Sequence, residues 1–376
     1  MDRHSTLSTG LFLMLPVILE VEVLKLKQML SRISLVSVSL GISFFQNEIS
    51  CLNEKGEHVD WFLIYKLPKF TSSGVGSGLN YMYTDAVVKS WVKSTYTVNS
   101  TEGALGRTFA QLYQGKGYMS NSTAYILYND GPPELKYLML FGHTKGALYF
   151  DKSQGFWISH TVPHFPPFPE RGFDYPSSGR LYGQTALCIT FKYQQLLQIS
   201  QQLAYYNPRV YNCSMPAVFQ ADMVVLGKMC EGVTPIVHMN KNLEILVSAG
   251  GELFCNFAKS QLFDDDIYTG WVAQELGTDL LAETWQRFPY QLAPNCSLPK
   301  HVFNVQNVSL PGPVVFWSHN DHSKWCVSWK YGDGWACLGD LNREATQAKR
   351  GGGLLCTQNP AIYSGLRLAV GLYDGC

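Results

Sequence analysis

The tripeptide pattern His-x-Lys occurs twice in the chain, as His143-Thr144-Lys145 and as His322-Ser323-Lys324. The two histidines are 179 residues apart, so the copies fall in different halves of the 376-residue chain. Two imidazoles can break a phosphodiester, because one can attack phosphorus while the other protonates the leaving alkoxide. Two ammonium groups can hold the non-bridging oxygens, on which negative charge builds up. The paired motifs therefore predict phosphodiester hydrolysis at a site shared by both halves.

Short strands must position these side chains. Residues at i and i+2 of a strand point to the same face, so each motif can aim its histidine and lysine into one cleft. The first motif is followed by apolar runs at 146–150 and 155–159, with a turn between them. The second is followed by runs at 325–329 and 335–338, separated by a glycine-rich turn at 332–334. Each motif is thus expected at the start of a β-hairpin.

The remaining pattern is mixed. Further strands are expected at 61–65 and 124–128, and a proline-rich extended loop at 163–169. Apolar residues at helical spacing predict helices at 193–206, 266–274 and 280–288. Such a mixture predicts an α/β or α+β fold in which a mixed central sheet is flanked by helices.

The amino-acid composition restricts the class of protein only broadly. Hydrophobic residues make up 46% of the chain and charged residues 15%, which is typical of a globular protein with a large core. The 29 basic and 29 acidic residues balance, which argues against a general nucleic-acid binder. The nine histidines would make the protein cationic in an acidic compartment, as suits a polyanionic substrate, but nine is an ordinary number.

Cysteines and glycosylation motifs indicate the secretory pathway. The ten cysteines lack the paired CxxC spacing of a zinc site, so disulfides are the better interpretation. Five Asn-x-Ser/Thr motifs predict a glycoprotein. Their asparagines are Asn99, Asn121, Asn212, Asn295 and Asn307.

The N-terminus resembles a signal peptide at 29–50 that starts at Met29, preceded by a second apolar run at 11–19. A membrane anchor is the alternative, although neither run reaches 18 uninterrupted apolar residues. We expect an extension and signal peptide at 1–50, an N-terminal lobe with the first motif at 51–205, and a C-terminal lobe with the second at 206–376. No stable membrane association is expected after the signal is removed.

The stretches around the motifs, and others throughout the presumed mature chain, closely resemble the deoxyribonuclease II family. They are Val59-Asp-Trp-Phe62, Tyr65-Lys-Leu-Pro68, Tyr128-Asn-Asp130, Gly142-His-Thr-Lys-Gly146, Gly155-Phe-Trp157, Phe165-Pro-Pro167, Asp265-Asp-Ile-Tyr268, Asp321-His-Ser-Lys-Trp-Cys326, Gly339-Asp-Leu-Asn-Arg343, and Gly352-Gly353 before Cys356. The beta form of the family is indicated by Ile49-Ser-Cys51, Thr284-Trp-Gln-Arg287, Asn295-Cys-Ser-Leu-Pro299 and Cys356-Thr-Gln-Asn359.

The resemblance implies a two-lobed, pseudo-dimeric fold similar to the phospholipase D superfamily, with one His-x-Lys in each lobe. It implies endonucleolytic hydrolysis of DNA at acid pH without a metal ion or other cofactor, leaving 3′-phosphate and 5′-hydroxyl ends. One histidine would be the nucleophile and the other the general acid, with the roles left open. It also implies a lysosomal enzyme that arrives by the secretory pathway or is secreted; a homodimer is one open possibility.

Two supporting residues follow from the superfamily pattern, in which an asparagine stands 17 residues after the histidine. His160 occupies that position after His143, whereas Asn342 is 20 residues after His322, consistent with a three-residue insertion in the 332–334 turn. The family also implies three disulfides, namely Cys51–Cys188, Cys296–Cys376 and Cys337–Cys356. A Cys213–Cys230 pair is a hypothesis from proximity, Cys326 is expected to be a buried free thiol, and Cys255 has no assigned partner.

Other interpretations remain beside these. The acidic run at 264–266 could hold a metal, but it fits a helix cap better. His160 with His164, or His319 with His322, could form metal pairs. The clustered tryptophans at 317, 325, 329 and 335 could include one or two that stack on bases. The alternative functions are a phospholipase D-like lipid phosphodiesterase and a catalytically dead, secreted nucleic-acid-binding glycoprotein.

Overall fold

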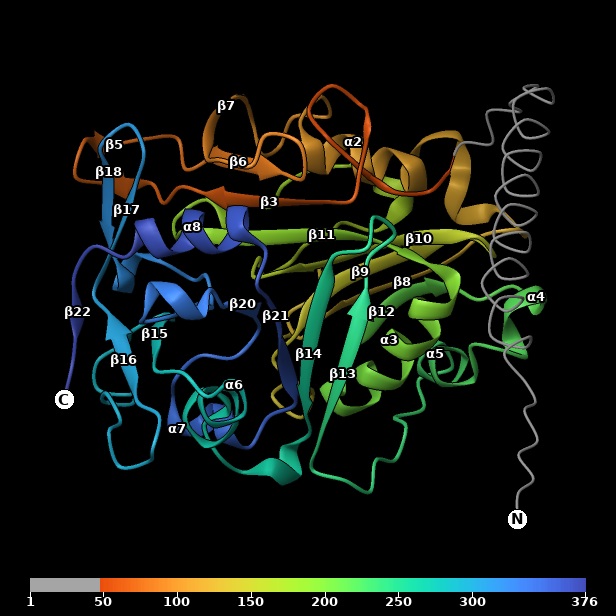
Figure 1. Ribbon diagram of the computed structural model, residues 1–376. Coiled ribbons are helices and arrows are strands. Elements are labelled where there is room, and N and C mark those ends of the chain that lie inside the picture. The colour runs from red at the N-terminus through yellow and green to blue at the C-terminus, as the bar shows by residue number, and fades with distance from the viewer. Residues whose placement is uncertain (1–47) are drawn as a thin grey trace, which may run out of the picture. The chain divides into compact units, whose positions relative to one another are not determined.

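Two eight-stranded sheets, one from each half of the chain, dominate the computed structural model, which describes residues 48–376 (Figure 1). The expected signal peptide lies outside the described residues except for its last three. The first sheet has the order β12-β8-β9-β10-β11-β3-β6-β7 and the second the order β13-β14-β21-β20-β19-β15-β16-β22. Neighbouring strands are antiparallel except β15 and β16, which are parallel.

The strands of the first sheet are β3 Trp61–Lys66, β6 Asn80–Asp85, β7 Val92–Thr97, β8 Ala124–Asn129, β9 Lys145–Phe150, β10 Gln154–His160, β11 Gln184–Lys192 and β12 Val210–Ser214. Those of the second are β13 Lys241–Val247, β14 Leu253–Lys259, β15 Leu280–Glu283, β16 Val302–Val305, β19 Trp325–Ser328, β20 Ala336–Gly339, β21 Gly352–Thr357 and β22 Tyr373–Asp374. Three two-stranded ribbons are β1 Cys51–Leu52 with β2 His58–Val59, β4 Phe70–Thr71 with β5 Gly74–Val75, and β17 Asn307–Leu310 with β18 Val314–Trp317.

The α-helices are α2 Ala104–Tyr113, α3 Tyr193–Tyr206, α4 Ala217–Gln220, α5 Val224–Cys230, α6 Ala273–Leu276, α7 Ala345–Ala348 and α8 Pro360–Ala369. A π-helix at Tyr268–Val272 runs into α6. Short 3₁₀ turns lie at Gln114–Met119, Pro169–Arg171, Ser177–Gly179, Gln261–Phe263, Ser318–Asn320 and Tyr331–Asp333. None of the helices formed by residues 48–376 is long and apolar enough to cross a membrane.

The two sheets share an internal plan. Strands β8-β9-β10-β11 are neighbours in that order in the first sheet, and β15-β19-β20-β21 are neighbours in that order in the second. The last strand of each set leads into a helix, α3 after β11 and α8 after β21. The same antiparallel meander followed by a helix therefore occurs in both halves, which confirms the expected two-lobed α+β fold.

The halves are packed together through a common core. Helix α3 buries Leu196, Ile199 and Leu203, whose spacing is that of one helix face, and it contacts strands of both sheets. It ends at Asn207, which takes the left-handed conformation that commonly closes helices. Residues Ile49–Cys376 accordingly form one compact unit. The chain leaves the first sheet after β12 and enters the second at β13, so the lobe division at 205/206 remains a prediction.

Most local predictions are confirmed, and one is wrong. Strands β3, β8, β9, β10, β19 and β20 and helix α3 occupy the expected ranges, and 266–274 is largely helical. The helix expected at 280–288 is instead strand β15 followed by a loop. β15 lies between β19 and β16, and all four of its residues are buried. The strand has only three apolar residues before Glu283, and periodicity cannot distinguish so short a buried run from the start of a helix.

Four disulfides are present: Cys51–Cys188, Cys213–Cys230, Cys296–Cys376 and Cys337–Cys356. They comprise the three pairs implied by the resemblance and the hypothetical fourth. Cys326 is a buried free thiol and Cys255 is a partly buried one.

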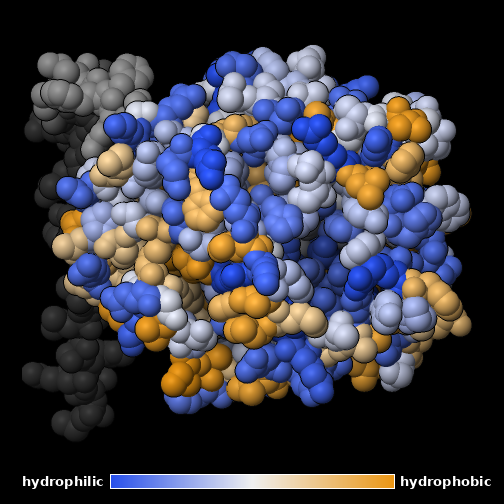
Figure 2. Space-filling view, turned by 180° about the vertical axis from the view of Figure 1, so that it is seen from behind, coloured by the Kyte–Doolittle hydropathy of each residue, from blue (hydrophilic) through white to orange (hydrophobic). Residues whose placement is uncertain are grey.

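The five candidate glycosylation sites differ in accessibility. Asn121 is exposed, and Asn99, Asn212 and Asn295 are partly exposed. Asn307 is buried, and its side-chain oxygen accepts a hydrogen bond from the backbone N–H of Leu372, so it is the least accessible of the five. The surface itself is mixed, with hydrophobic side chains gathered in patches among hydrophilic ones on the face shown in Figure 2.

Candidate active site

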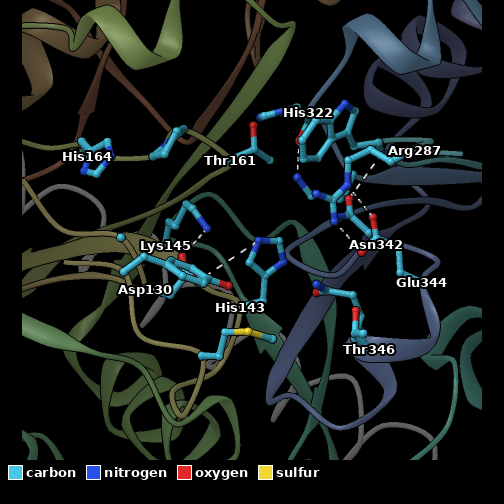
Figure 3. A pocket seen from close by; sticks show the side chains of 17 residues that line it. Asp130, His143, Lys145, Thr161, His164, Arg287, His322, Asn342, Glu344 and Thr346 are labelled. Atoms are coloured by element: carbon cyan, nitrogen blue, oxygen red, sulfur yellow. Dashed lines mark hydrogen bonds and ion pairs between the residues drawn. The ribbon is translucent and has the colours of Figure 1, made fainter. Parts of the chain in front are cut away.

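Both His-x-Lys motifs open into one pocket of about 390 Å³. His143, Lys145, His322 and Lys324 all line it, together with Asn342. Figure 3 shows His143 between Asp130 and Lys145 on one side and Arg287 and Asn342 on the other. Residues that lie in different halves of the sequence thus share a single cavity.

Each motif histidine is held in place by the opposite half of the chain. The backbone N–H of His143, just before β9, donates to the carbonyl of Gly351 ahead of β21 at 2.9 Å. The N–H of His322, shortly before β19, donates to the carbonyl of Gly183 ahead of β11, also at 2.9 Å. The first bond links the start of β9 to the start of β21, and the second links the start of β19 to the start of β11, which are the corresponding strands of the other half. The position of each imidazole therefore depends on how the two halves pack together.

Only glycine fits at these two support points. A Cβ on Gly351 would lie 2.5 Å from the carbonyl oxygen of Tyr206, and one on Gly183 would lie 2.3 Å from Oδ1 of Asp321. Contacts this short require the neighbouring atoms to move. The glycines therefore allow the backbone of one half to approach the motif of the other.

A buried carboxylate connects the first motif to the C-terminal half. Asp130, directly after β8, accepts hydrogen bonds from Lys145 Nζ at 2.5 Å and from Arg350 Nη2 at 2.8 Å. Its Oδ2 lies 3.9 Å from Nε2 of His143. Burial alone would raise the pKa of Asp130, but the cationic neighbours hold that pKa well below its ordinary value. Asp130 consequently stays ionised in mildly acidic solution.

The imidazole of His143 lies among opposing charges. Burial and then the Lys145 ammonium lower its pKa well below the ordinary value, while the Asp130 carboxylate acts in the opposite direction. Its Nδ1 is buried and has no hydrogen-bond partner among the described residues. This nitrogen and the neighbouring Asp130 together leave His143 able to bind or release a proton at the pocket.

His322 has a different environment. Its ring stacks on Tyr182, with centroids 4.1 Å apart and planes at 9°, and lies 3.9 Å from the ring of Trp285. Burial, followed by the charge of Lys324, lowers its pKa to about 2. Its Nε2 is buried without a hydrogen-bond partner in the described part of the chain. The two rings fix the plane of a neutral imidazole.

The second lysine is also buried. Lys324 Nζ donates to the carbonyl of its own motif's His322. Burial and the charge of Lys145 lower the pKa of Lys324 to about 7. An ammonium with this pKa is fully charged in acid and loses its charge above neutrality, so the positive charge of the pocket increases as the pH falls.

The two supporting residues are placed differently. Asn342 lines the pocket, and its Oδ1 accepts a hydrogen bond from the N–H of Trp285 at 3.3 Å. His160 does not line the pocket. It is buried at the end of β10, where the register of Ser159 with Gly146 places it opposite Lys145. Burial, followed by the charge of Lys145, lowers the pKa of His160 to about 3, so it is a neutral part of the wall behind that lysine.

Several residues of the site are not evident from the sequence. Asp130 and Arg350 pair across 220 residues, and Tyr182 and Trp285 enclose His322 from two separate loops. Strand pairing could have indicated one of these residues, Asp130. Strand β8 lies beside β9 with Asn129 opposite Lys145, so the acidic residue that follows β8 must lie close to the motif. The other three depend on loop conformation.

The acidic run is a helix cap, as the sequence favoured. Asp266 accepts hydrogen bonds from the N–H of Tyr268 at 3.2 Å and the hydroxyl of Thr269 at 2.6 Å, and it pairs with Arg343 at 3.0 Å. Within residues 48–376, no three His, Cys, Asp or Glu side chains are grouped as metal ligands.

Comparison with known proteins agrees with this geometry. The sequence profile of the family described as Deoxyribonuclease II matches residues 50–376. The chain is 47% identical to deoxyribonuclease-2-beta of Homo sapiens over 87% of this chain and 92% of the relative. It is 45% identical to the beta protein of Mus musculus over 93% and 99%, and 38% identical to deoxyribonuclease-2-alpha of Sus scrofa over 87% and 91%. The chain belongs to the deoxyribonuclease II family, and its higher identity to these beta proteins places it with the beta form.

Proposed function

We propose that this protein is an acid endodeoxyribonuclease, which hydrolyses DNA phosphodiesters without a metal ion and leaves 3′-phosphate and 5′-hydroxyl ends. The observation that carries the proposal is the convergence of two His-x-Lys motifs, one from each half of the chain, on one pocket. The relatives at 47% and 45% identity bear the name deoxyribonuclease-2-beta. DNA is therefore the substrate that we assign.

The reaction proceeds in two displacements. In the first, a neutral imidazole nitrogen attacks phosphorus and forms a P–N bond, while the bond to the 5′-oxygen breaks and that oxygen takes a proton from the second, protonated imidazole. In the second, the now neutral second imidazole removes a proton from water, the hydroxide forms a new P–O bond, and the P–N bond breaks. The product strands carry a 3′-phosphate and a 5′-hydroxyl.

The environments of the two histidines suggest which one is the nucleophile and which one is the general acid. Among the described residues, His143 is the motif histidine whose ring lies within ion-pair distance of a carboxylate, Asp130 at 3.9 Å, and a carboxylate stabilises the protonated ring. Every charged group that acts on the pKa of His322 lowers it, which favours the neutral form. We therefore assign His322 as the nucleophile and His143 as the general acid.

The lysines supply the charge stabilisation that a metal ion supplies in other nucleases. Lys145 and Lys324 both line the pocket, and each can bind a non-bridging oxygen through its ammonium group. Because the buried histidines have lowered pKa values, protonating the general acid requires an acidic medium or the negative charge of bound substrate. Activity is therefore expected to rise as the pH falls from 7 toward 5.

Lysosomal localisation through the secretory pathway is part of the proposal. Four disulfides are typical of proteins that fold in an oxidising compartment. The acidity that the lysines and histidines need would be met in a lysosome. The more accessible asparagines, Asn99, Asn121, Asn212 and Asn295, would carry the glycans.

Plasmid cleavage by the purified glycoprotein tests the function. We expect nicking and linearisation at pH 5 in the presence of EDTA, with little cleavage at pH 7.5. The products should serve as polymerase primers only after phosphatase treatment, because a 3′-phosphate blocks extension. Cleavage that stops with EDTA, or ends that prime directly, would contradict the proposal, and release of a lipid headgroup in place of DNA cleavage would favour the lipid phosphodiesterase.

A further inference from the structure

Two aromatic residues line the pocket, at equivalent places in the two halves. Tyr137 belongs to the loop that follows β8, and Trp285 to the loop that follows β15. β8 and β15 are the strands that lie beside the two motif strands, β9 and β19. The strand order therefore relates the two rings by the same pseudo-symmetry as the motifs.

Each ring is held by an arginine that is itself paired with a carboxylate. The hydroxyl of Tyr137 accepts a hydrogen bond from Arg350 at 2.7 Å, and Arg350 pairs with Asp130. On the other wall, the guanidinium of Arg287 lies 4.4 Å from the ring centre of Trp285, and Arg287 pairs with Glu344 at 3.1 Å.

Both rings are thereby fixed in place. Tyr137 is 50% exposed. Trp285 lines the pocket but is partly buried, because its ring packs on His322 and its Nε1–H donates to the carbonyl of His319 at 3.1 Å. A preorganised ring of this kind loses little conformational entropy when a flat ligand stacks on it.

Exposed hydrophobic side chains follow both residues in the sequence. Met139, which also lines the pocket, and Leu140 are 61% and 65% exposed after Tyr137, and Phe288 and Tyr290 are 88% and 61% exposed after Trp285. Large exposed apolar side chains in the loops that line a pocket indicate a binding surface. A nucleic-acid strand combines a charged backbone with apolar base faces, so it complements the lysines and the aromatic walls together.

We propose that Tyr137 and Trp285 are specificity-determining residues that each stack on one nucleobase beside the scissile phosphate. This inference rests on the proposed nuclease function. A phosphodiester carries one nucleoside on each side, and the two rings come from loops of different halves of the chain. The pocket of about 390 Å³ has the size of a small-molecule site, so we infer that only a short unpaired stretch of a strand enters it. The substrate segment at the moment of cleavage is a locally unpaired strand with its two bases splayed apart.

Abasic substrates test the inference. Each oligonucleotide has a single cleavable phosphodiester among methylphosphonate linkages, with the base present or removed on the 5′ or the 3′ side. For the wild-type enzyme, removing a stacked base should lower kcat/KM by about tenfold, within the range for stacking one base on an aromatic ring. Tyr137→Leu should lower kcat/KM for the intact substrate by a similar factor. Removing the base that stacks on Tyr137 should then cause no further loss. Trp285→Leu should be insensitive to removal of the other base.

The comparison within each variant separates stacking from general damage. Trp285→Leu also loses a ring that packs on His322, but this lowers cleavage of intact and abasic substrates alike. Tyr137→Phe keeps the ring and should retain the sensitivity to base removal. Tyr331→Leu is the matched control: Tyr331 is 62% exposed and carries a stacked guanidinium, that of Arg367 at 4.3 Å, but it does not line the pocket.

The outcomes distinguish the two proposals. A wild-type enzyme that cleaves every substrate equally well, with or without bases, overturns the stacking inference and leaves the nuclease function intact. The same holds if Tyr137→Leu responds to base removal as the wild type does. A wild-type enzyme that cleaves none of the oligonucleotides contradicts the nuclease function itself.

Discussion

At the scale of single residues, the site is asymmetric although its motifs are alike. His143 lies beside Asp130, whereas His322 is enclosed by Tyr182 and Trp285. The four motif residues were predicted from their repeated spacing together with the resemblance of the surrounding stretches to one family. The expected strand geometry does not place them, because His143 precedes β9, and His322 and Lys324 precede β19. The different surroundings of the two histidines come from loops and could not be predicted. His160 was predicted from its distance in sequence to His143, but it lies opposite Lys145 at the end of β10 and does not line the pocket.

The asymmetry predicts different effects for the two histidine substitutions. With thymidine 3′-(4-nitrophenyl phosphate), the leaving nitrophenolate needs no proton. His143→Ala should therefore release one equivalent of nitrophenol in a burst and then stall, because no base activates water for the second step. His322→Ala should show no burst. Stopped-flow absorbance measures both, and a burst in His322→Ala alone would reverse our assignment.

Asp130 should set the acid dependence of the reaction. In Asp130→Asn the imidazolium of His143 loses its carboxylate, so the pKa of His143 falls further and its protonation needs a lower pH. The kcat–pH profile should shift toward acid, with a lower maximum. Glu134→Gln is the control, because Glu134 is an exposed residue that pairs with Arg171. An unchanged profile in Asp130→Asn would show that this carboxylate does not act on the general acid.

At the scale of elements, strands were easier to predict than their packing. The alternation and turns around β9 and β19 predicted both hairpins, whereas the apolar stretch of β15 was taken for a helix because it is buried on both faces. The crossed hydrogen bonds from His143 to Gly351 and from His322 to Gly183 have no signature in a single sequence. They depend on two strand ends that approach each other only in the folded chain.

The close approach of the backbone at Gly351 predicts that adding one methyl group there lowers both stability and activity. In Gly351→Ala the new Cβ would lie 2.5 Å from the Tyr206 carbonyl, so the start of β21 must shift and His143 with it. We expect a stability loss of about 1–3 kcal/mol, as for overpacking, and a fall in kcat of ~100-fold from misplacement of the imidazole. Gly227→Ala, in helix α5 with open space at its Cβ, should leave both unchanged or gain slightly in stability. Near-normal kcat in Gly351→Ala would contradict the positioning role.

At the scale of the whole molecule, two halves with the same strand order form one site. The repeat is nearly invisible in the sequence, because only the two short motifs and their hairpins are similar. What persists is the order β8-β9-β10-β11 and β15-β19-β20-β21 with a helix after each set. The resemblance of many short segments to one family predicted this two-lobed plan, whereas composition and periodicity predicted only a mixed fold.

Asp340 should contribute more stability in acid than at neutral pH, in opposition to the buried histidines, whose lowered pKa values favour the folded state as the pH rises. Burial raises the pKa of Asp340 to about 7, against an ordinary value near 4 in the unfolded chain. Between these values the folded state holds a proton that the unfolded state has lost, so this group's contribution to stability is lost as the pH rises from about 4 to 7. Relative to the wild type, Asp340→Asn should therefore gain stability as the pH rises from 4.5 to 7.5, measured by urea unfolding at both pH values. An unaltered pH dependence would show that Asp340 is not the group responsible.

The stereochemistry at phosphorus tests the two-histidine mechanism most directly. A phosphorothioate diester of one configuration is hydrolysed in ¹⁸O-water, and the configuration of the chiral 3′-phosphorothioate product is determined. Each in-line displacement inverts the phosphorus centre, so a covalent histidine intermediate followed by water predicts overall retention. Overall inversion would mean that water attacks DNA in a single step, and it would contradict the account.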